Sequence, residues 1–323
     1  MCRVAKIRAE ARQIALDVYN ANFLKLAGVA EDIARDRAER ITRDYLEKLQ
    51  AENPGGLDSV QDPDMLQAIF TAQKAYACSG EEDLEKALVD LLVDRSGQRD
   101  RELKTLVLNE AIAMLPKLSI RQRKSIAVCF LIRHTRYTGA LNLGFYYDYL
   151  ARNLTPFAES LSDNSVDYQH IQSAGAGWIS SLSLELGRAF TDDARGFFTR
   201  GFTEVDLPPF LDLRDSEVFV PCIRNSQKWQ LNVLSKEHVI ELGAKKRAPE
   251  ILDELSRRGI MSYREIQLDL ESHIPCMKVI FERWNNNNSV LKFFQLTSVG
   301  IAIGHAYWRQ AAGTAAAPLG VWL

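Results

Sequence analysis

The stretch SIRQRKSIAVCFLIRH, residues 119–134, decides the fold class of this chain. Ser119 and Gln122 have the spacing of a capping box, in which the two side chains bond each other's backbone N–H groups at a helix start. The segment that follows, Ile126–Ile132, is apolar on every side. Such a segment is typical of a helix buried at the centre of a protein. The stretch therefore predicts a central helix surrounded by other helices.

Upstream, residues 7–49 show the same helical period. Their apolar side chains recur every three or four residues, and Arg, Asp and Glu alternate on the opposite face (Ile7, Ala11, Ile14, Val18, Leu26, Ile33, Ile41, Tyr45 and Leu49). We expect one long, heptad-like helix, or two helices that meet near Gly28. Asn53-Pro54 should end it, because proline lacks the N–H that a helix interior requires.

Further start signals follow. Asp62-Pro63 predicts an N-cap with proline in the first turn, and Ser79 to Glu82 predicts a second capping box. A third helix should end at Pro116 and turn one apolar face inward (Leu103, Leu106, Val107, Ala111 and Leu115). The short connections favour antiparallel neighbours. We therefore expect an antiparallel helical bundle over residues 1–160.

The pattern weakens beyond residue 160. In residues 161–234, five glycines and Pro208-Pro209 break the helical pattern into short pieces, so we expect an irregular connecting region with a short strand near Val218–Ile223. Residues 235–323 are helical again, with a capping box at Ser262 to Glu265, a strand over Val290–Leu296 and a last helix capped by Thr297. This order resembles a winged-helix unit, although the same helices could simply complete the core. The predicted fold is mainly α.

The charge balance gives little support to nucleic-acid binding. The chain has 40 basic and 42 acidic residues, and residues 235–311 hold 11 basic against 9 acidic residues. Proteins that bind DNA neutralise many phosphates and need a stronger basic surface. The five cysteines are scattered and odd in number, which is typical of reduced thiols. With no apolar signal segment at the start of the chain, we expect a cytoplasmic protein.

No known catalytic motif is present. The sequence contains neither a phosphate-binding GxxxxGK[ST] loop nor a GxSxG elbow, and its five histidines stand apart from one another. His273 and Cys276 have the spacing of half a zinc site, but no second pair lies nearby in sequence. We therefore expect no metal and no cofactor, and we favour a protein that is not an enzyme.

Basic residues flank the apolar centre of the predicted central helix. They are Arg121, Arg123 and Lys124 before it, with Arg133 and Arg136 after it. Such flanks can make a patch that binds an anionic membrane surface. The alternative is a buried helix whose polar ends reach the protein surface, and we favour this alternative.

An enzymatic alternative rests on the middle of the chain. A nuclease or similar effector could assemble its site there from residues that are distant in sequence (His170, Trp178, Asp192 and Asp193). The histidine and the two aspartates among them are residue types that can hold a metal ion or move a proton. Their spacing matches no known motif, so the hypothesis depends on the fold.

Several stretches together resemble a bacterial family catalogued by locus-tag names. They are ARQIALDVYNANFLKLAG (11–28), FTAQKAYACSGEEDLEKALVDLLVDR (70–95), VLNEAIAMLPKL (107–118), LTSVGIAIGHAYWR (296–309) and GVWL (320–323). The resemblance spans nearly the whole chain and implies no catalytic residues. It does imply a role in phage defence.

The sequence as a whole predicts a non-enzymatic interaction or sensor protein. Its heptad-like first helix favours a protein partner or self-association. The alternatives are the enzyme with a site at the middle of the chain and the membrane-surface binder through residues 121–136.

Overall fold

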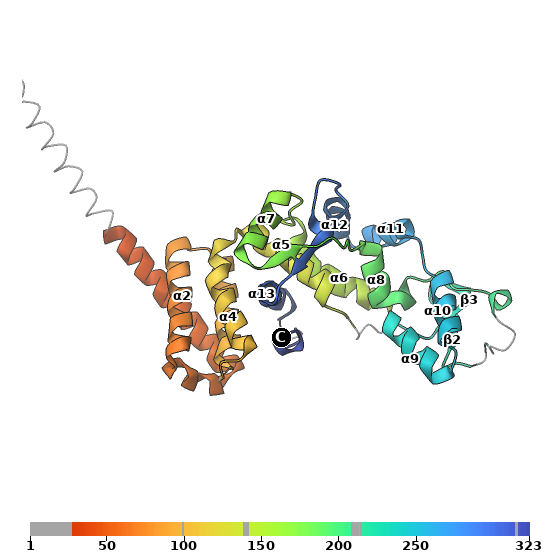
Figure 1. Ribbon diagram of the computed structural model, residues 1–323, viewed down its shortest axis with the longest axis horizontal. Helices are drawn as coiled ribbons and strands as arrows, with labels where there is room; N and C mark the ends of the chain where they lie inside the picture. Colours follow the sequence, from red (N-terminus) through yellow and green to blue (C-terminus); the bar gives the residue numbers. More distant parts are fainter. Residues whose placement is uncertain (1–27, 99, 138–141, 208–212, 214, 314–315) are drawn as a thin grey trace, which may run out of the picture. The chain divides into compact units, whose positions relative to one another are not determined.

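The computed structural model describes the chain except residues 1–27, 99, 138–141, 208–212, 214 and 314–315 (Figure 1). The described part is mainly helical, with two small two-stranded sheets. The chain folds into two compact units, Met1–Pro116 and Lys117–Leu323. The predicted class, mainly α, is confirmed. The apolar positions Ile7 to Leu26 of the predicted first helix lie outside the described residues.

The first unit consists of helices. They are a helix over residues 28–52, the 3-10 helix η1 (Pro54–Gln61), α2 (Pro63–Ser79), α3 (Glu82–Ser96) and α4 (Leu103–Met114). The first of these ends just before Pro54, as predicted. It runs antiparallel to α2, because Arg37 bonds the carbonyl oxygen of Ala77 while Gln73 bonds Thr42.

One predicted start in this unit is confirmed and one is wrong. Asp62 caps α2, and its side chain accepts the N–H of Asp64 at 3.1 Å. The predicted capping box at Ser79 is wrong: Ser79 is the last residue of α2, and α3 begins at Glu82. Gly80 separates the two helices with a φ of 65°, a left-handed conformation that ends helices and that glycine adopts without strain.

The inward face predicted for the third helix is only partly correct. Val107, Ala111 and Leu115 are buried, but Leu103 is 68% exposed and Leu106 is 39% exposed. Both exposed residues lie in the first two turns of α4, which begins at Leu103. Leu103 and Leu106 thus fit the apolar period of the helix, but no other part of the first unit that the structure describes packs over them.

The second unit contains the remaining elements. The helices are η2 (Leu115–Lys117, across the unit boundary), α5 (Ile120–His134), α6 (Leu143–Ala158), α7 (Ser165–Ala174), α8 (Leu186–Ala194), η3 (Arg195–Phe197), η4 (Glu204–Asp206), α9 (Lys236–Lys246), α10 (Pro249–Arg258), α11 (Tyr263–His273), α12 (Cys276–Trp284), η5 (Leu291–Phe293), α13 (Ser298–Ala312) and η7 (Leu319–Val321). The strands are β1 (Gly177–Ile179), β2 (Phe219–Cys222), β3 (Asn225–Leu231) and β4 (Phe294–Leu296).

Helix α5 is the buried helix that the sequence predicts. Both hydrogen bonds of its Ser119–Gln122 capping box are present, and Ile126 to Phe130 are fully buried. It packs most extensively against α13, and then against α6. Since α13 lies near the end of the chain, α5 belongs with the C-terminal part of the protein. The unit boundary therefore falls at 116/117 and not at the predicted 160.

The C-terminal elements do not form a separate winged-helix unit. The strand expected at Val290–Leu296 is the short β4, which pairs antiparallel with β1, so that Gly177 lies opposite Leu296. Its partner comes from the region expected to be irregular. Helix α12, which would be the recognition helix, buries Met277, Ile280 and Trp284. Neither a wing hairpin nor an exposed recognition helix is formed by these residues.

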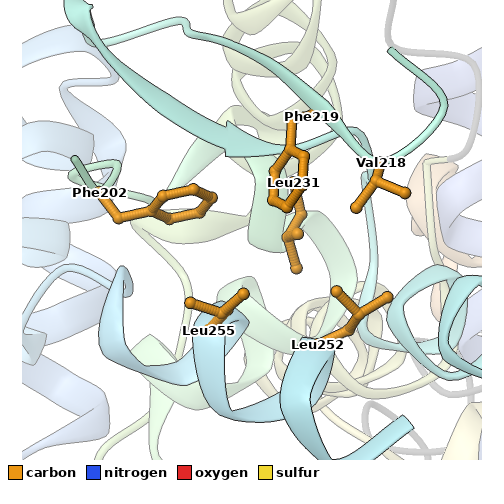
Figure 2. Packing of buried hydrophobic residues seen from close by; sticks show 6 residues of the cluster. All are labelled: Phe202, Val218, Phe219, Leu231, Leu252 and Leu255. Carbon is orange, nitrogen blue, oxygen red and sulfur yellow. The ribbon is translucent and has the colours of Figure 1, made fainter. Parts of the chain in front are cut away.

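The region predicted to be irregular, 161–234, contains the helices α7 and α8 and the hairpin of β2 and β3. The strand expected near Val218–Ile223 is confirmed as β2. The hairpin lies over α10, and Figure 2 shows the apolar side chains between them. These are Phe202, Val218, Phe219, Leu231, Leu252 and Leu255, all buried. Here the region from 161 to 234 and the helices after 235 share one core.

Candidate functional site

A cavity of about 840 Å³ lies within the second unit. Its walls come from the end of α5 and the residues after it, one face of α6, the end of α13 and the segment 317–322. The lining residues are Arg133, His134, Thr135, Arg136, Tyr137, Phe145, Asp148, Tyr149, Arg152, Asn153, Trp308, Ala312, Ala317, Val321 and Trp322. This volume lies in the range of pockets that hold small molecules.

Helix α6 supplies one wall because of its period. Phe145, Asp148, Tyr149 and Arg152 occupy positions i, i+3, i+4 and i+7, which places them on one helix face. The neighbouring Tyr146 and Leu150 point into the core and are buried. The helix start is fixed by Asn142, whose side chain accepts the N–H of Phe145 at 3.0 Å. The polar and aromatic face of α6 is thus held toward the cavity.

Two tryptophans hold the C-terminal segment against α5 and α6. The indole N–H of Trp322 donates to the carbonyl oxygen of His134 at 2.6 Å, and that of Trp308 donates to Asn153 Oδ1 at 2.7 Å. The two indole rings lie edge to face, with centroids 5.9 Å apart. Phe130 lies 5.1 Å from the Trp322 ring. Because both N–H groups are bonded, this wall offers its aromatic surface to the cavity.

A second aromatic surface comes from two tyrosines. The rings of Tyr137 and Tyr149 are stacked, with centroids 4.3 Å apart and an interplanar angle of 4°. The Tyr149 hydroxyl donates to Thr135 Oγ1 at 3.3 Å. Phe145 is on the same helix as Tyr149 and is half exposed. Flat aromatic walls of this kind stack on planar ligands.

The charged side chains of the cavity are three arginines and one aspartate, Asp148. Arg133 is held by the carbonyl oxygen of Lys292 at 2.7 Å and lies over the Trp284 ring. Arg136 forms an ion pair of 2.7 Å with Glu237. Arg152 is exposed and makes no ion pair with any residue that the structure describes. The cavity therefore has an excess of positive charge, and Arg152 is placed to bind an anion.

His134 is a neutral group in this wall. Burial, and after it the positive charge of Arg133, lowers the pKa of its imidazole to about 4. Its ring stacks on Phe130, with centroids 6.1 Å apart. Its Nε2 is buried and has no hydrogen-bond partner among the described residues. At neutral pH, His134 adds a polar but uncharged atom beside the arginines.

The five basic residues predicted as a surface patch do not form one. Arg121 is exposed near Asp163, Lys124 is partly buried, and Arg123 is only 1% exposed. Arg133 lies at the other end of α5, about 18 Å from Arg121 at 1.5 Å per residue, and Arg136 follows two residues after the helix. Only Arg133 and Arg136 reach the cavity. The interpretation as a membrane-binding face is wrong for Arg123, because its side chain lies inside the protein.

The four residues of the predicted enzymatic site each contact different residues. His170 on α7 contacts Gln122 Oε1 at 3.1 Å, and Trp178 on β1 is 46% exposed opposite Gln295. On α8, Asp192 lies 3.6 Å from Arg195 Nη2, while Asp193 accepts the hydroxyl of Tyr146 at 3.3 Å. Each of the four therefore has its own set of contacts.

Most of the cavity residues could not be singled out from the sequence. Of the candidates predicted from it, only Arg133 and Arg136 line the cavity. The face of α6 carries a readable signal, since aromatic and charged residues alternate there at helical spacing. Nothing in the sequence shows that this face meets the end of α13, which lies about 160 residues further on.

The described residues offer neither a metal centre nor a membrane span. They contain no group of three or more His, Cys, Asp or Glu side chains that could hold a metal ion. None of the helices described has both the length and the apolar content that crossing a bilayer requires.

Comparison with known proteins gives one match. No curated protein and no solved structure matches this chain. One family model matches residues 7–323, and its description names no activity. The match extends over both compact units and every residue that lines the cavity. The chain therefore belongs, over almost its whole length, to the family that this model describes.

Proposed function

We propose that this protein is a non-enzymatic sensor that binds a small aromatic anion in the cavity of its second unit. The observation that carries the proposal is the composition of the walls, in which five aromatic side chains surround a space bordered by three arginines. Aromatic rings stack on a planar ligand, and guanidinium groups bind carboxylate, sulfate or phosphate.

The same residue types favour binding over catalysis. A guanidinium group stays protonated at any physiological pH, so it stabilises an anion but does not move a proton. His134, which could act as a base, is partly buried, and its ring stacks on Phe130. Arg136 is paired with Glu237, so Arg152 is the exposed arginine of the lining that has no ion pair among the described residues.

A sensor also needs a part that responds to its ligand. The segment 317–322 is such a part, because it closes one side of the cavity through Trp322. A ligand that contacts this wall shifts the segment toward the arrangement that it binds best. A partner protein that recognises this arrangement would then receive the signal. Phage defence, which the resemblance implies, is the biological setting that we propose.

The experiment uses two probes that differ in charge. They are 1-anilinonaphthalene-8-sulfonate, an aromatic anion, and its neutral counterpart N-phenyl-1-naphthylamine, each titrated calorimetrically into the full chain. We expect the sulfonate to bind about tenfold more tightly than the neutral compound, because one charge-assisted contact contributes about 1.5 kcal/mol. Arg152→Gln should remove this preference, and Ala312→Trp, which fills the cavity, should weaken both compounds.

The matched control is Arg264→Gln, which removes an exposed arginine from α11, away from the cavity lining. It should leave both affinities unchanged. If neither probe binds, or if Ala312→Trp leaves binding intact, the cavity is not a ligand site and the proposal fails.

A further inference from the structure

A groove of about 680 Å³ crosses the surface of the first unit. It runs along the helix of residues 28–52 and is bordered by η1 and α2. The lining residues are Arg35, Ala38, Glu39, Thr42, Arg43, Leu46, Glu47, Gln50, Leu57 and Gln73. Most of them come from one helix, between residues 35 and 50, so the groove follows that helix.

The groove is apolar along its centre. Leu46 and Leu57 both line the groove, and they are 40% and 42% exposed. Gln73 donates to Thr42 Oγ1 at 2.8 Å, so this amide is already bonded within the floor. On α2, Phe70 lies outside the groove lining, one turn before Gln73, and is 59% exposed. Exposed apolar side chains in such a row are typical of a protein contact.

Four charged residues form a ridge beside this apolar centre. They are spaced four apart and alternate in sign: Arg35, Glu39, Arg43 and Glu47. All four are exposed. Arg35 lies 3.0 Å from Glu31, and Arg43 lies 3.5 Å from Asp44, both as ion pairs within the exposed helix. Exposed pairs of this kind contribute little and exchange readily for others.

The order of these charges is complementary to itself when it is reversed. If two copies of the helix pack antiparallel about a two-fold axis near residue 41, Arg35 lies opposite Glu47 of the second copy. Glu39 then lies opposite Arg43, and each of these contacts occurs twice. Residues four apart form the ridges that interlock in the commonest class of helix packing. Parallel copies in register would instead place like charges at the same height.

We propose that this groove binds a second copy of the same chain, as an antiparallel homodimer. The ridge of Arg35, Glu39, Arg43 and Glu47 sets the register, and Leu46, Leu57 and Phe70 supply the apolar contact. The inference extends the sequence-based expectation of self-association to a surface and an orientation. It does not depend on the cavity of the second unit.

Charge reversal tests the proposal on the full chain. Sedimentation equilibrium at low ionic strength should show a dimer for the wild type at micromolar concentration. Glu39→Arg and Arg43→Glu each turn two attractive contacts into repulsive ones, and we expect each to weaken the dimer about tenfold or more. The double variant Glu39→Arg/Arg43→Glu restores opposite charges across the axis, so it should return the dissociation constant to within about threefold of the wild type.

Lys86→Glu is the matched control, because it reverses an exposed charge on α3, which does not border the groove. It should leave the dimer unchanged. Circular dichroism should show the same helix content in all variants, since the reversed side chains are exposed. The proposal is overturned if the wild type stays monomeric over the micromolar range, if the single reversals leave the dimer intact, or if the double variant fails to restore it.

Discussion

Asp193 is a carboxyl group whose acidity is strongly altered by the fold of the second unit. Burial raises its pKa from 3.8 to about 6, while the hydroxyl of Tyr146 and the charge of Arg136 act in the opposite direction. The hydroxyl donates to Asp193 Oδ2 at 3.3 Å. Because the folded protein holds the proton more tightly than the unfolded chain does, ionisation of Asp193 at neutral pH opposes folding.

Replacing Asp193 with asparagine should therefore stabilise the protein in a pH-dependent way. The wild type loses stability as the pH rises from about 4 through about 6, to a total of about 3 kcal/mol at 1.36 kcal/mol per pKa unit. The asparagine side chain still accepts the Tyr146 hydroxyl but does not ionise. Urea unfolding at pH 8 should show Asp193→Asn to be more stable, and the two proteins should agree near pH 4. Equal stability at both pH values would contradict the assignment.

At the scale of elements, the contact between α5 and α13 holds the second unit together. It depends on a glycine, because a Cβ on Gly304 would lie 2.5 Å from Phe130 Cβ. Both are backbone-fixed atoms, so a larger residue can be accommodated only if the helices separate. The same helices carry residues of the cavity wall, among them His134 and Trp308.

Gly304→Ala should destabilise the second unit by about 2 kcal/mol, the usual cost of overpacking a core. Alanine has a better helix propensity than glycine by about 1 kcal/mol, so the steric cost must exceed that gain. Thermal unfolding followed by circular dichroism measures the difference. Gly28→Ala is the control, because a Cβ there has no atom within 4 Å, and it should be neutral or stabilising.

Capping signals predicted several helix starts because they act over three or four residues. Ser119, Ser262 and Thr297 all cap helices by accepting the backbone N–H three residues on. The capping box predicted at Ser79 is wrong because Ser79 belongs to the end of α2, where Gly80 takes a left-handed conformation. Local chemistry thus predicts starts well, except where a helix end and a helix start compete for the same residues.

At the scale of the whole molecule, the two compact units should differ in their response to mutation. In the first unit, Arg95 is 2% exposed and joins three helices. It bonds Asp64 on α2 at 2.7 Å, Asn109 on α4 at 2.9 Å and the carbonyl oxygen of Gln98 at 3.1 Å. All of these partners lie within the first unit.

Arg95→Met keeps much of the volume of the side chain and removes all three contacts, so it should destabilise the first unit by about 2 kcal/mol. Hydrogen exchange with mass spectrometry should show faster exchange in peptides of α2, α3 and α4. Peptides of α5 and α13 should exchange as in the wild type. Faster exchange throughout the chain would show instead that the two units unfold together.

The cavity and the unit boundary could not be predicted from the sequence because both depend on distant contacts. The apolar segment Ile126–Ile132 identifies α5 as a buried helix, yet it does not say that α13 packs against it. The pairing of β1 with β4 likewise joins residues that are far apart along the chain. Helical periodicity gives the class of fold, and the choice among helix partners rests on side-chain shape, such as Gly304 against Phe130.

The position of Trp308 and Trp322 has a practical consequence. Of the five tryptophans in the chain, these two line the cavity, and both are bonded through their indole nitrogens. Indole emission changes with the polarity of its surroundings, so occupancy of this space alters the light that the protein itself emits. Intrinsic tryptophan fluorescence can therefore be used to screen a library of unlabelled compounds for binding to the cavity.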